Sequence, residues 1–288
     1  MGVGATLAIW ALAGCGANST VATSAAKGID VPADIEQAGV ISIASDLAYP
    51  PFDYLDESGQ PAGIEVDMAK AVGKKMGVRV EFHKIDFPSV VPSIANRRYD
   101  MATDEFADTP ERQKVVSFVD WYRVVDRVQV LAGNSKNLTG DDLCGHSFPV
   151  VTGSYEVGVL DRVGNDCKKA NKPEPEVLTF QDAGAMQQAL ANGRADGLLS
   201  NAAASAYAVT TSQGKLTLAP GDVGQSTGRV AGFVFPKDND ALVKAVVQSI
   251  NALKADGTWD TILRTHGIQE YAVTPVTVNT QPYALGSK

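Results

Sequence analysis

The alternation of strand-like and helix-like segments constrains the fold of this chain more than any other feature of its sequence. Residues 40–44 form an apolar run of strand length, and residues 64–76 repeat apolar side chains at helical spacing before Gly77. Residues 78–82 then alternate apolar and polar side chains, as a half-buried strand does, and Asp86 precedes the next helical segment. This alternation favours α/β units with largely parallel sheets.

The same alternation starts again in the middle of the chain, which predicts a second lobe. Residues 124–131 form an extended run suited to crossing between lobes, and residues 148–151 and 182–192 indicate a strand and a capped helix. Residues 229–235 predict a strand that returns the chain, and residues 239–256 predict its clearest helix. The predicted boundaries are 34–125 for the first part of lobe 1, 126–228 for lobe 2, 229–273 for the returning part of lobe 1, and 274–288 for a loose C-terminal tail.

Length and charge agree with a two-lobed globular chain. The chain has 288 residues, of which 44% are hydrophobic, enough to bury two cores. Its formal net charge of −8, with acidic and basic residues interspersed, argues against nucleic acid or an anionic membrane as the main partner. Beyond the first few residues, no apolar run approaches the roughly 18 residues that can span a bilayer.

The N-terminus resembles a bacterial lipoprotein signal. Residues 5–13 form a mostly apolar stretch, and Leu-Ala-Gly at 12–14 directly precedes Cys15, as in a lipobox. We expect residues 1–15 to be a signal peptide with its lipobox, Cys15 to take a lipid, and residues 16–33 to form a flexible tether. Residues 1–9 lack Lys and Arg, which leaves open a start upstream of Met1, and a frayed apolar terminus is the alternative reading.

Two further cysteines, Cys144 and Cys167, favour one disulfide in an exported chain. A loop of this length contributes about 3 kcal/mol to stability by the loop-entropy argument. Two buried free thiols are the alternative.

Several motifs in the right order identify a resemblance to a known family. They are SDLAYPPF at 45–52, GIEVDM at 63–68, TPER at 109–112, GRAD at 193–196 and LKADGTW at 253–259. Together they make the chain resemble family 3 of the bacterial extracellular solute-binding proteins, the polar amino-acid-binding proteins of ABC importers, over residues 40–267. The resemblance implies a type II periplasmic-binding-protein fold, with two lobes joined by two crossover strands that close like a hinge.

The resemblance also implies a function. We expect a monomeric, lipid-anchored substrate-binding protein on the extracytoplasmic face of the cell membrane, working with an ABC permease and needing no cofactor. Its ligand is expected to be a small polar amino acid, or an amino-acid-like carboxylate that also carries positive charge. A cationic solute that is not an amino acid, and a sensory role, remain alternatives.

Arg112 matches the family arginine that pairs with the ligand carboxylate. A positive charge in the first turn of a helix opposes the helix dipole, so stability alone does not explain it there. An anion at that place meets both the guanidinium and free backbone N–H groups, in charge-assisted bonds worth about 1.5–3 kcal/mol. The alternative is an arginine on the solvated surface.

Other family positions predict the rest of the site. Each of these residues also has a purely structural explanation. The aromatic residues can be part of the core, Phe52 most readily, and the others can form a turn or a helix cap. The residues matched are Tyr49, Phe52 and Phe87 as an aromatic clamp, Gly153, Ser154 and Tyr155 as a turn that clasps the carboxylate, and Asp46 as a partner for a basic ligand group.

Two departures from the family pattern bear on the ligand. Asn201 stands where the family usually presents an aspartate to the ligand ammonium. Glu105, Phe106 and Ala107 stand in a loop where relatives commonly carry hydroxyls. Either the ligand is cationic near Glu105, or Glu105 takes over ammonium binding; a Glu105 that points outward or pairs with Arg112 is the alternative.

Enzymatic readings are weaker. The same fold hosts a dehydratase activity, for which Glu105 or Asp46 would serve as general acid. The Gly-x-Ser-x-Gly string at residues 224–228 precedes a strand instead of joining a strand to a helix, unlike a hydrolase elbow. His83, His146 and His266 lie far apart and show no ligand spacing, so we expect the chain to bind no metal.

Overall fold

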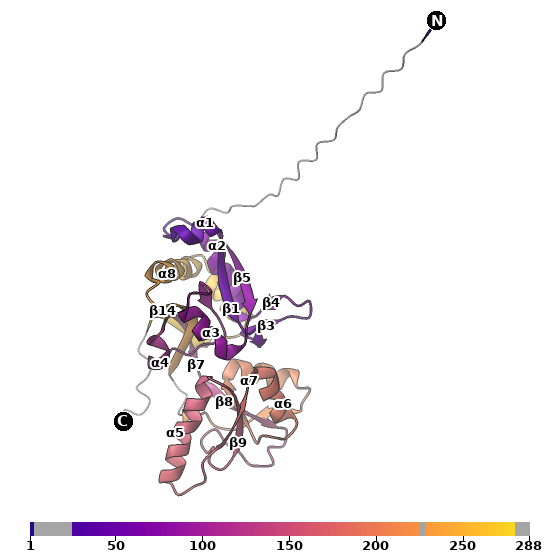
Figure 1. Ribbon diagram of the computed structural model, residues 1–288. Helices are drawn as coiled ribbons and strands as arrows, with labels where there is room; N and C mark the ends of the chain where they lie inside the picture. The colour runs from indigo at the N-terminus through magenta and orange to yellow at the C-terminus, as the bar shows by residue number, and fades with distance from the viewer. Residues whose placement is uncertain (3–24, 225–227, 280–288) are drawn as a thin grey trace.

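The computed structural model describes residues 1–2, 25–224 and 228–279, and these form two α/β lobes (Figure 1). Lobe 1 contains a six-stranded sheet in the order β14-β7-β13-β6-β1-β5. Its strands are β1 Val40–Ser45, β5 Arg79–Lys84, β6 Met101–Ala102, β7 Val116–Val124, β13 Arg229–Pro236 and β14 Ala272–Val278, and a small sheet adds β2 Ala48–Tyr49, β3 Asp53–Leu55 and β4 Pro61–Ala62. Its helices are α1 Ala33–Ala38, α2 Ile64–Met76, α3 Phe87–Ala95, α4 Pro110–Gln113, α8 Asp240–Ala255, α9 Thr258–Thr265 and the short 3₁₀ turn η2 Gln269–Tyr271.

Lobe 2 lies below lobe 1 in Figure 1 and contains two smaller sheets. Its elements are β8 Asp126–Leu131, β9 Ser147–Val151, α5 Tyr155–Lys169, β10 Glu176–Phe180, α6 Ala183–Ala191, β11 Leu198–Asn201, α7 Ala202–Thr211 and β12 Leu216–Leu218. β9 pairs with β10, and β8 lies between β11 and β12. The predicted two-lobe α/β fold is confirmed.

The sheets are mixed, in contrast to the largely parallel sheets expected from the sequence. β1 runs parallel to β5 and β6, but β13 runs antiparallel to β6 and β7, and β14 antiparallel to β7. β7 carries the chain toward lobe 2 and β13 carries it back, so these two neighbours must run in opposite directions. Periodicity alone does not reveal the direction of a strand.

Lobe 1 buries both faces of its sheet because alternate residues of each strand point to opposite sides. On β13, Phe233 and Phe235 join the core under α2, α8 and α9, whereas Val234 joins the core under α3. Trp121 and Trp259 pack edge to face in the first of these cores, with ring centroids 5.8 Å apart. A strand buried on both faces is rigid support for loops at its ends.

Local signals in the sequence set several element ends. Gly77 ends α2 with φ of 72°, a left-handed conformation that glycine adopts readily. Thr109 caps α4, since its Oγ1 accepts a hydrogen bond from the Arg112 N–H at 3.2 Å. Asp182 caps α6 in the same way. These caps fix the start of two helices that border the cleft.

The two lobes meet at a hinge made by two chain crossings. β7 ends at Val124 and β8 begins at Asp126, so the first crossing passes through Val125. The chain returns between β12 in lobe 2 and β13 in lobe 1. Part of this return, residues 225–227, lies outside the described residues, as does most of the Gly-x-Ser-x-Gly string.

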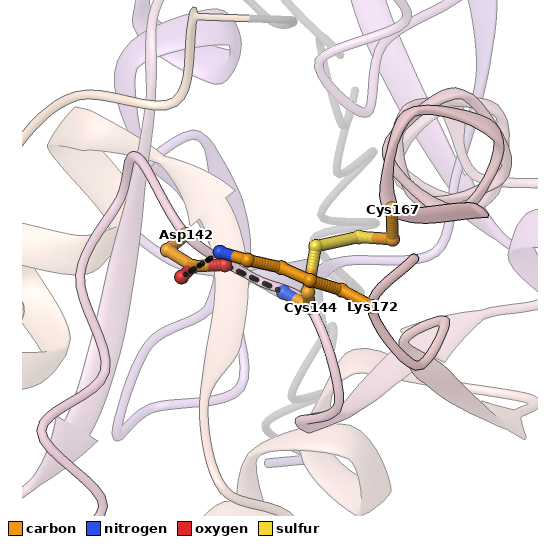
Figure 2. The surroundings of a disulfide bond; sticks show 4 residues. All are labelled: Asp142, Cys144, Cys167 and Lys172. Carbon is orange, nitrogen blue, oxygen red and sulfur yellow. Dashed lines mark hydrogen bonds and ion pairs between the residues drawn. A yellow bond between two sulfur atoms is a disulfide. The ribbon is translucent and has the colours of Figure 1, made fainter. Parts of the chain in front are cut away.

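The predicted disulfide between Cys144 and Cys167 is confirmed (Figure 2). It joins the loop before β9 to the last turn of α5, across a sequence separation of 23 residues. Asp142 accepts hydrogen bonds from the Cys144 N–H at 3.3 Å and from Lys172 Nζ at 2.7 Å, so the same corner of lobe 2 is also held by an ion pair.

Two terminal expectations differ from the structure. Residues 25–33 were expected to belong to a flexible tether, but the Ala26 N–H donates to the Lys75 carbonyl and Asp30 pairs with Lys244, so this segment docks on lobe 1. Residues 274–278 were expected to be loose, but they complete β14, which pairs with β7. The small polar residues of such segments give no sequence signal for this docking, because the partners are backbone groups and distant side chains. The lipobox with Cys15, and residues 280–288, lie outside the described residues.

None of the helices in the described parts of the chain has the length and apolar character needed to cross a membrane.

Candidate functional site

A cavity lies between the two lobes beside the hinge, with about 550 Å³ of empty space including its open mouth. Both lobes contribute to its wall, and half of the contributors are polar or charged. The lining residues are Asp46, Tyr49, Phe87, Asp104, Glu105 and Arg112, then Val151, Ser154, Tyr155, Glu156, Ala183, Met186, Leu199 and Ser200, and finally Arg229. Seven of the twelve residues predicted to bind ligand are among them: Asp46, Tyr49, Phe87, Glu105, Arg112, Ser154 and Tyr155.

Arg112 reaches from α4 in lobe 1 toward lobe 2. Its Nη1 donates to the Ala107 carbonyl at 2.9 Å and its Nη2 donates to the Gly153 carbonyl at 3.1 Å. The guanidinium carbon also lies 4.9 Å from the centre of the Phe106 ring. Burial lowers the pKa of Arg112 to about 10, so the side chain stays charged at neutral pH. Two backbone bonds hold the guanidinium in place and leave further N–H donors for an anion.

The turn before α5 faces the same space from lobe 2. Gly153 has φ of 78°, and no atom lies within 4 Å of where its Cβ would be, so the turn is open above this residue. Ser154 precedes the first residue of α5, yet its hydroxyl makes no capping bond and has no hydrogen-bond partner. The N-terminus of a 15-residue helix and a free hydroxyl thus lie near Arg112, an arrangement that suits an anion.

Aromatic rings from lobe 1 form one side of the cavity. Tyr49 lines it and stacks on Phe52, with ring centroids 5.8 Å apart. Phe87 lines it and stacks on Phe106 at 4.8 Å. Phe52 and Phe106 are each 1% exposed, so they support the lining rings from the core instead of facing the cavity. Only the outer ring of each stack can contact a ligand.

Glu105 and Asn201 meet across the cleft. The Asn201 amide Nδ2 donates to Glu105 Oε1 at 3.0 Å, while its Oδ1 accepts from the Ala203 N–H and caps α7. Burial raises the pKa of Glu105 well above its usual range, and the nearby Glu156 carboxylate adds to this. Glu105 therefore neither points outward nor forms an ion pair with Arg112. Since the cap occupies the Asn201 carbonyl, Glu105 is the better acceptor for a ligand cation.

Arg229 is a site residue that the sequence did not reveal. It is 2% exposed, forms an ion pair with Asp126, and stacks on Tyr155, with its guanidinium carbon 3.3 Å from the ring centre. Burial acts to lower the pKa of Arg229, but Asp126, together with Tyr155, Glu156 and Glu105, outweighs burial and the pKa is raised. Asp126 and Arg229 begin the two strands at the hinge, 103 residues apart in sequence. To predict that Arg229 contacts Asp126, one would have to know from the sequence which two strands cross at the hinge.

Other residues missing from the prediction lie beside predicted ones. Asp104 precedes Glu105 and Glu156 follows Tyr155, and both line the cavity. Among predicted residues that do not line it, Gly153 and Ala107 bind Arg112 through their carbonyls, and Asn201 binds Glu105. The cavity thus holds more acidic than basic groups: Asp46, Asp104, Glu105 and Glu156 against Arg112 and Arg229, the second of which already pairs with Asp126.

Comparison with known proteins gives consistent matches over the two lobes. The sequence model of the family 'bacterial extracellular solute-binding proteins, family 3' matches residues 41–269 of this chain. The arginine-binding protein ArgT of Corynebacterium glutamicum is 27% identical over 260 residues, which cover 88% of this chain and 82% of that protein. The L-cystine-binding protein TcyJ of Escherichia coli K12 is 26% identical over 229 residues, covering 78% of this chain and 81% of that protein.

A solved structure of an ancestral arginine-binding protein bound to arginine has a TM-score of 0.71 and 27% identity to this chain. The match covers 79% of this chain and 97% of that chain. The similarity therefore extends through both lobes and the hinge.

Proposed function

The chain belongs to family 3 of the bacterial extracellular solute-binding proteins, and from this premise we propose that it is the lipid-anchored substrate-binding component of an ABC importer for a cationic α-amino acid. The proposal includes a monomeric chain held at the extracytoplasmic face of the membrane through Cys15. Relatives named for arginine and for cystine support an amino acid as the ligand.

The observation that carries this proposal is the pairing of one positive anchor with an excess of acids in the same cleft. Arg112, the Ser154 hydroxyl and the start of α5 suit the ligand carboxylate. Glu105 lies across the cleft from Asn201, which stands at the position of the family aspartate, and we assign the ligand ammonium to Glu105. Glu156 lines the same cavity and adds a further negative charge near both groups.

The charge balance favours a ligand with a second positive group. Arg229 already has Asp126 as its partner, so it adds little net positive potential to the cavity. Burial and Glu156 raise the pKa of Glu105, so a cationic ligand group beside Glu105 favours its ionised form. An anionic side chain would instead meet the carboxylate of Glu156, and such like charges disfavour a wrong ligand. Tyr49 and Phe87 offer flat faces to the alkyl part or to the cation.

The test is isothermal titration of the purified chain with arginine, ornithine, lysine, cystine and glutamate. We expect the three cationic amino acids to bind at least about tenfold more tightly than glutamate, which corresponds to about 1.4 kcal/mol. Agmatine, which is arginine without its carboxylate, is the matched ligand control and should bind much more weakly than arginine. Glutamate binding as tight as arginine, or agmatine as tight as arginine, would contradict the assignment.

The membrane anchor has its own test. A Cys15→Ser variant should leave the membrane fraction of expressing cells, while the wild-type chain stays in it. Equal membrane retention of the two proteins would exclude an anchor at Cys15.

A further inference from the structure

A cluster of buried carboxyl groups lies beneath the floor of the cavity, in lobe 1. Asp46 and Asp104 line the cavity and are 6% and 3% exposed, whereas Asp53 lies behind them at 0% exposure. One carboxylate oxygen from each of the three lies within 4.8 Å of the others. Asp46 follows β1, Asp53 begins β3 and Asp104 follows β6, so three separate segments place acids at one point.

The surroundings do not neutralise this cluster. Asp104 accepts hydrogen bonds from the Ser45 hydroxyl and the Asp46 N–H, and Asp46 accepts one from the Ala48 N–H. In residues 25–224 and 228–279, no ion pair joins any of the three acids to a lysine, arginine or histidine. Burial raises the pKa of all three acids, although Lys84 acts to lower that of Asp46. The cluster is therefore stable only with added protons or with a bound cation.

Asp53 and Thr103 supply an independent sign of a bound cation. Neither oxygen of Asp53 accepts a hydrogen bond, although the group is fully buried. The Thr103 hydroxyl is also fully buried and lies beside the Asp53 carboxyl, whose pKa it acts to lower, but the two side chains lack the geometry of a full hydrogen bond. Glu65 accepts from the Asp104 and Glu105 N–H groups and from the Tyr122 hydroxyl, and its carboxyl also contacts that of Asp53. It therefore adds a fourth acid to the cluster and no positive charge.

We propose that Asp46, Asp53 and Asp104 bind one hard divalent cation of the Ca²⁺ type, with the Thr103 hydroxyl as a further oxygen ligand. All of these donors are oxygen atoms, which is the donor set such ions prefer. Ca–O distances of about 2.3–2.6 Å allow two ligands of one ion to lie up to about 5 Å apart, and these carboxylate oxygens lie within 4.8 Å of one another. Water on the cavity side, where Asp46 and Asp104 open to it, would complete the coordination.

The burial of Asp53 separates this ion from the amino-acid ligand. A ligand ammonium or guanidinium in the cavity can approach Asp46 and Asp104, but Asp53 has no exposed surface for it to contact. A bare ion fits among all three oxygens. The two proposals share Asp46 and Asp104, which belong to the acidic excess of the cleft, whereas Asp53 and Thr103 belong to the ion site alone.

The experiment is titration of the chelator-treated full chain with CaCl₂ and with MgCl₂, by calorimetry and by thermal unfolding. We expect one Ca²⁺ to bind per chain and to raise the melting temperature. Asp53→Asn should weaken Ca²⁺ binding at least about tenfold, because it removes a charged ligand. Asp56→Asn is the matched control: Asp56 is exposed on the turn after β3, bonds only within that turn, and its loss should leave Ca²⁺ affinity unchanged.

Two results overturn the proposal. The first is a wild-type chain that binds neither Ca²⁺ nor Mg²⁺, which would mean that the acids are neutralised by shared protons. The second is Ca²⁺ binding that Asp53→Asn does not weaken. If Asp53→Asn fails to fold, the Ca²⁺ affinity of Thr103→Val is compared with that of the wild type instead, since Thr103 is an uncharged ligand. Equal Ca²⁺ affinity in the two proteins removes Thr103 from the site. Arginine titration of the chelator-treated chain reports the amino-acid site separately, so the two proposals fail independently.

Discussion

At the residue scale, the cleft depends on a few side chains whose positions are fixed by backbone contacts. Arg112 is held by the Ala107 and Gly153 carbonyls, and its own N–H is capped by Thr109. The TPER motif predicted this cap and this arginine because both belong to one helical turn. The Asn201 carbonyl, by contrast, is taken up by a helix cap, a local use that its sequence position could not distinguish from ligand binding.

Replacing Arg112 by alanine should abolish binding of amino-acid ligands while leaving the fold intact. The variant loses the charged donor for the carboxylate, a contact worth about 1.5–3 kcal/mol, so affinity should fall at least about tenfold. Calorimetric titration measures this, with circular dichroism to confirm the fold. Arg79→Ala, at an exposed position of β5, is the control and should bind as the wild type does; unchanged affinity in Arg112→Ala would remove the anchor.

Asp108 should make stability depend on pH. Burial raises the pKa of Asp108 to about 6, although Gln113 donates a hydrogen bond to it. In the unfolded chain the pKa is near 4, so between these values the folded state binds more protons and stability falls as pH rises. The loss is on the order of 2–3 kcal/mol between pH 4 and pH 7.

An Asp108→Asn variant should lack this part of the pH dependence, since asparagine still accepts from Gln113 but does not ionise. Urea unfolding at pH 4.5 and pH 7 measures the difference. The exposed Asp161 on α5 offers a control, because Asp161→Asn should keep the wild-type dependence. Identical pH profiles for Asp108→Asn and wild type would show that Asp108 ionises normally.

At the element scale, the hinge is tied by one buried ion pair between its two strands. Asp126 at the start of β8 is 0% exposed and Arg229 at the start of β13 is 2% exposed. Tyr155, at the start of α5, stacks on the same guanidinium. The pair therefore links both hinge strands to the helix whose N-terminus borders the cleft.

Arg229→Gln should destabilise the chain by about 3–5 kcal/mol, because it removes the charge that compensates the buried Asp126. Asp126→Asn in the same chain should recover a large part of that loss, since the uncompensated charge is then gone. Chemical unfolding of the wild type, both single variants and the double variant gives the coupling free energy. Strictly additive losses would mean that the two side chains stabilise the hinge separately.

Sequence patterns predicted elements well where the signal is local and poorly where it comes from distant segments. The glycine that ends α2 and the caps of α4 and α6 act within a few residues, so each could be predicted. β14 could not, since its strand character depends on pairing with β7, about 150 residues earlier in the chain. The Arg229–Asp126 pair was missed for the same reason, as was the docking of residues 25–33.

At the scale of the whole molecule, the two lobes form one site only when they approach each other. Polar contacts join them at the cleft, Arg112 with the Gly153 carbonyl and Glu105 with Asn201. Apolar contacts add to these, because Tyr49 and Phe87 of lobe 1 pack against the Val151 and Met186 cluster of lobe 2. Neither lobe alone provides both a carboxylate anchor and a complete wall. A ligand that bridges Arg112 and the start of α5 therefore binds the closed arrangement better, and by its differential affinity shifts the population toward it.

Closure should be visible as a change in shape. We expect small-angle scattering of the purified chain to give a smaller radius of gyration with saturating arginine than without it, because the bound ligand holds the lobes together. The same ligand at about 100 times its Kd should add about 2.7 kcal/mol to the free energy of unfolding. The Arg112→Ala variant, which lacks the bridging charge, should show a smaller stabilisation at the same arginine concentration, about 1.4 kcal/mol or less for a Kd at least about tenfold higher. A radius of gyration that stays constant while the unfolding free energy rises would mean that the lobes are already closed before the ligand binds, and that the ligand enters through the mouth of the cavity without moving the hinge.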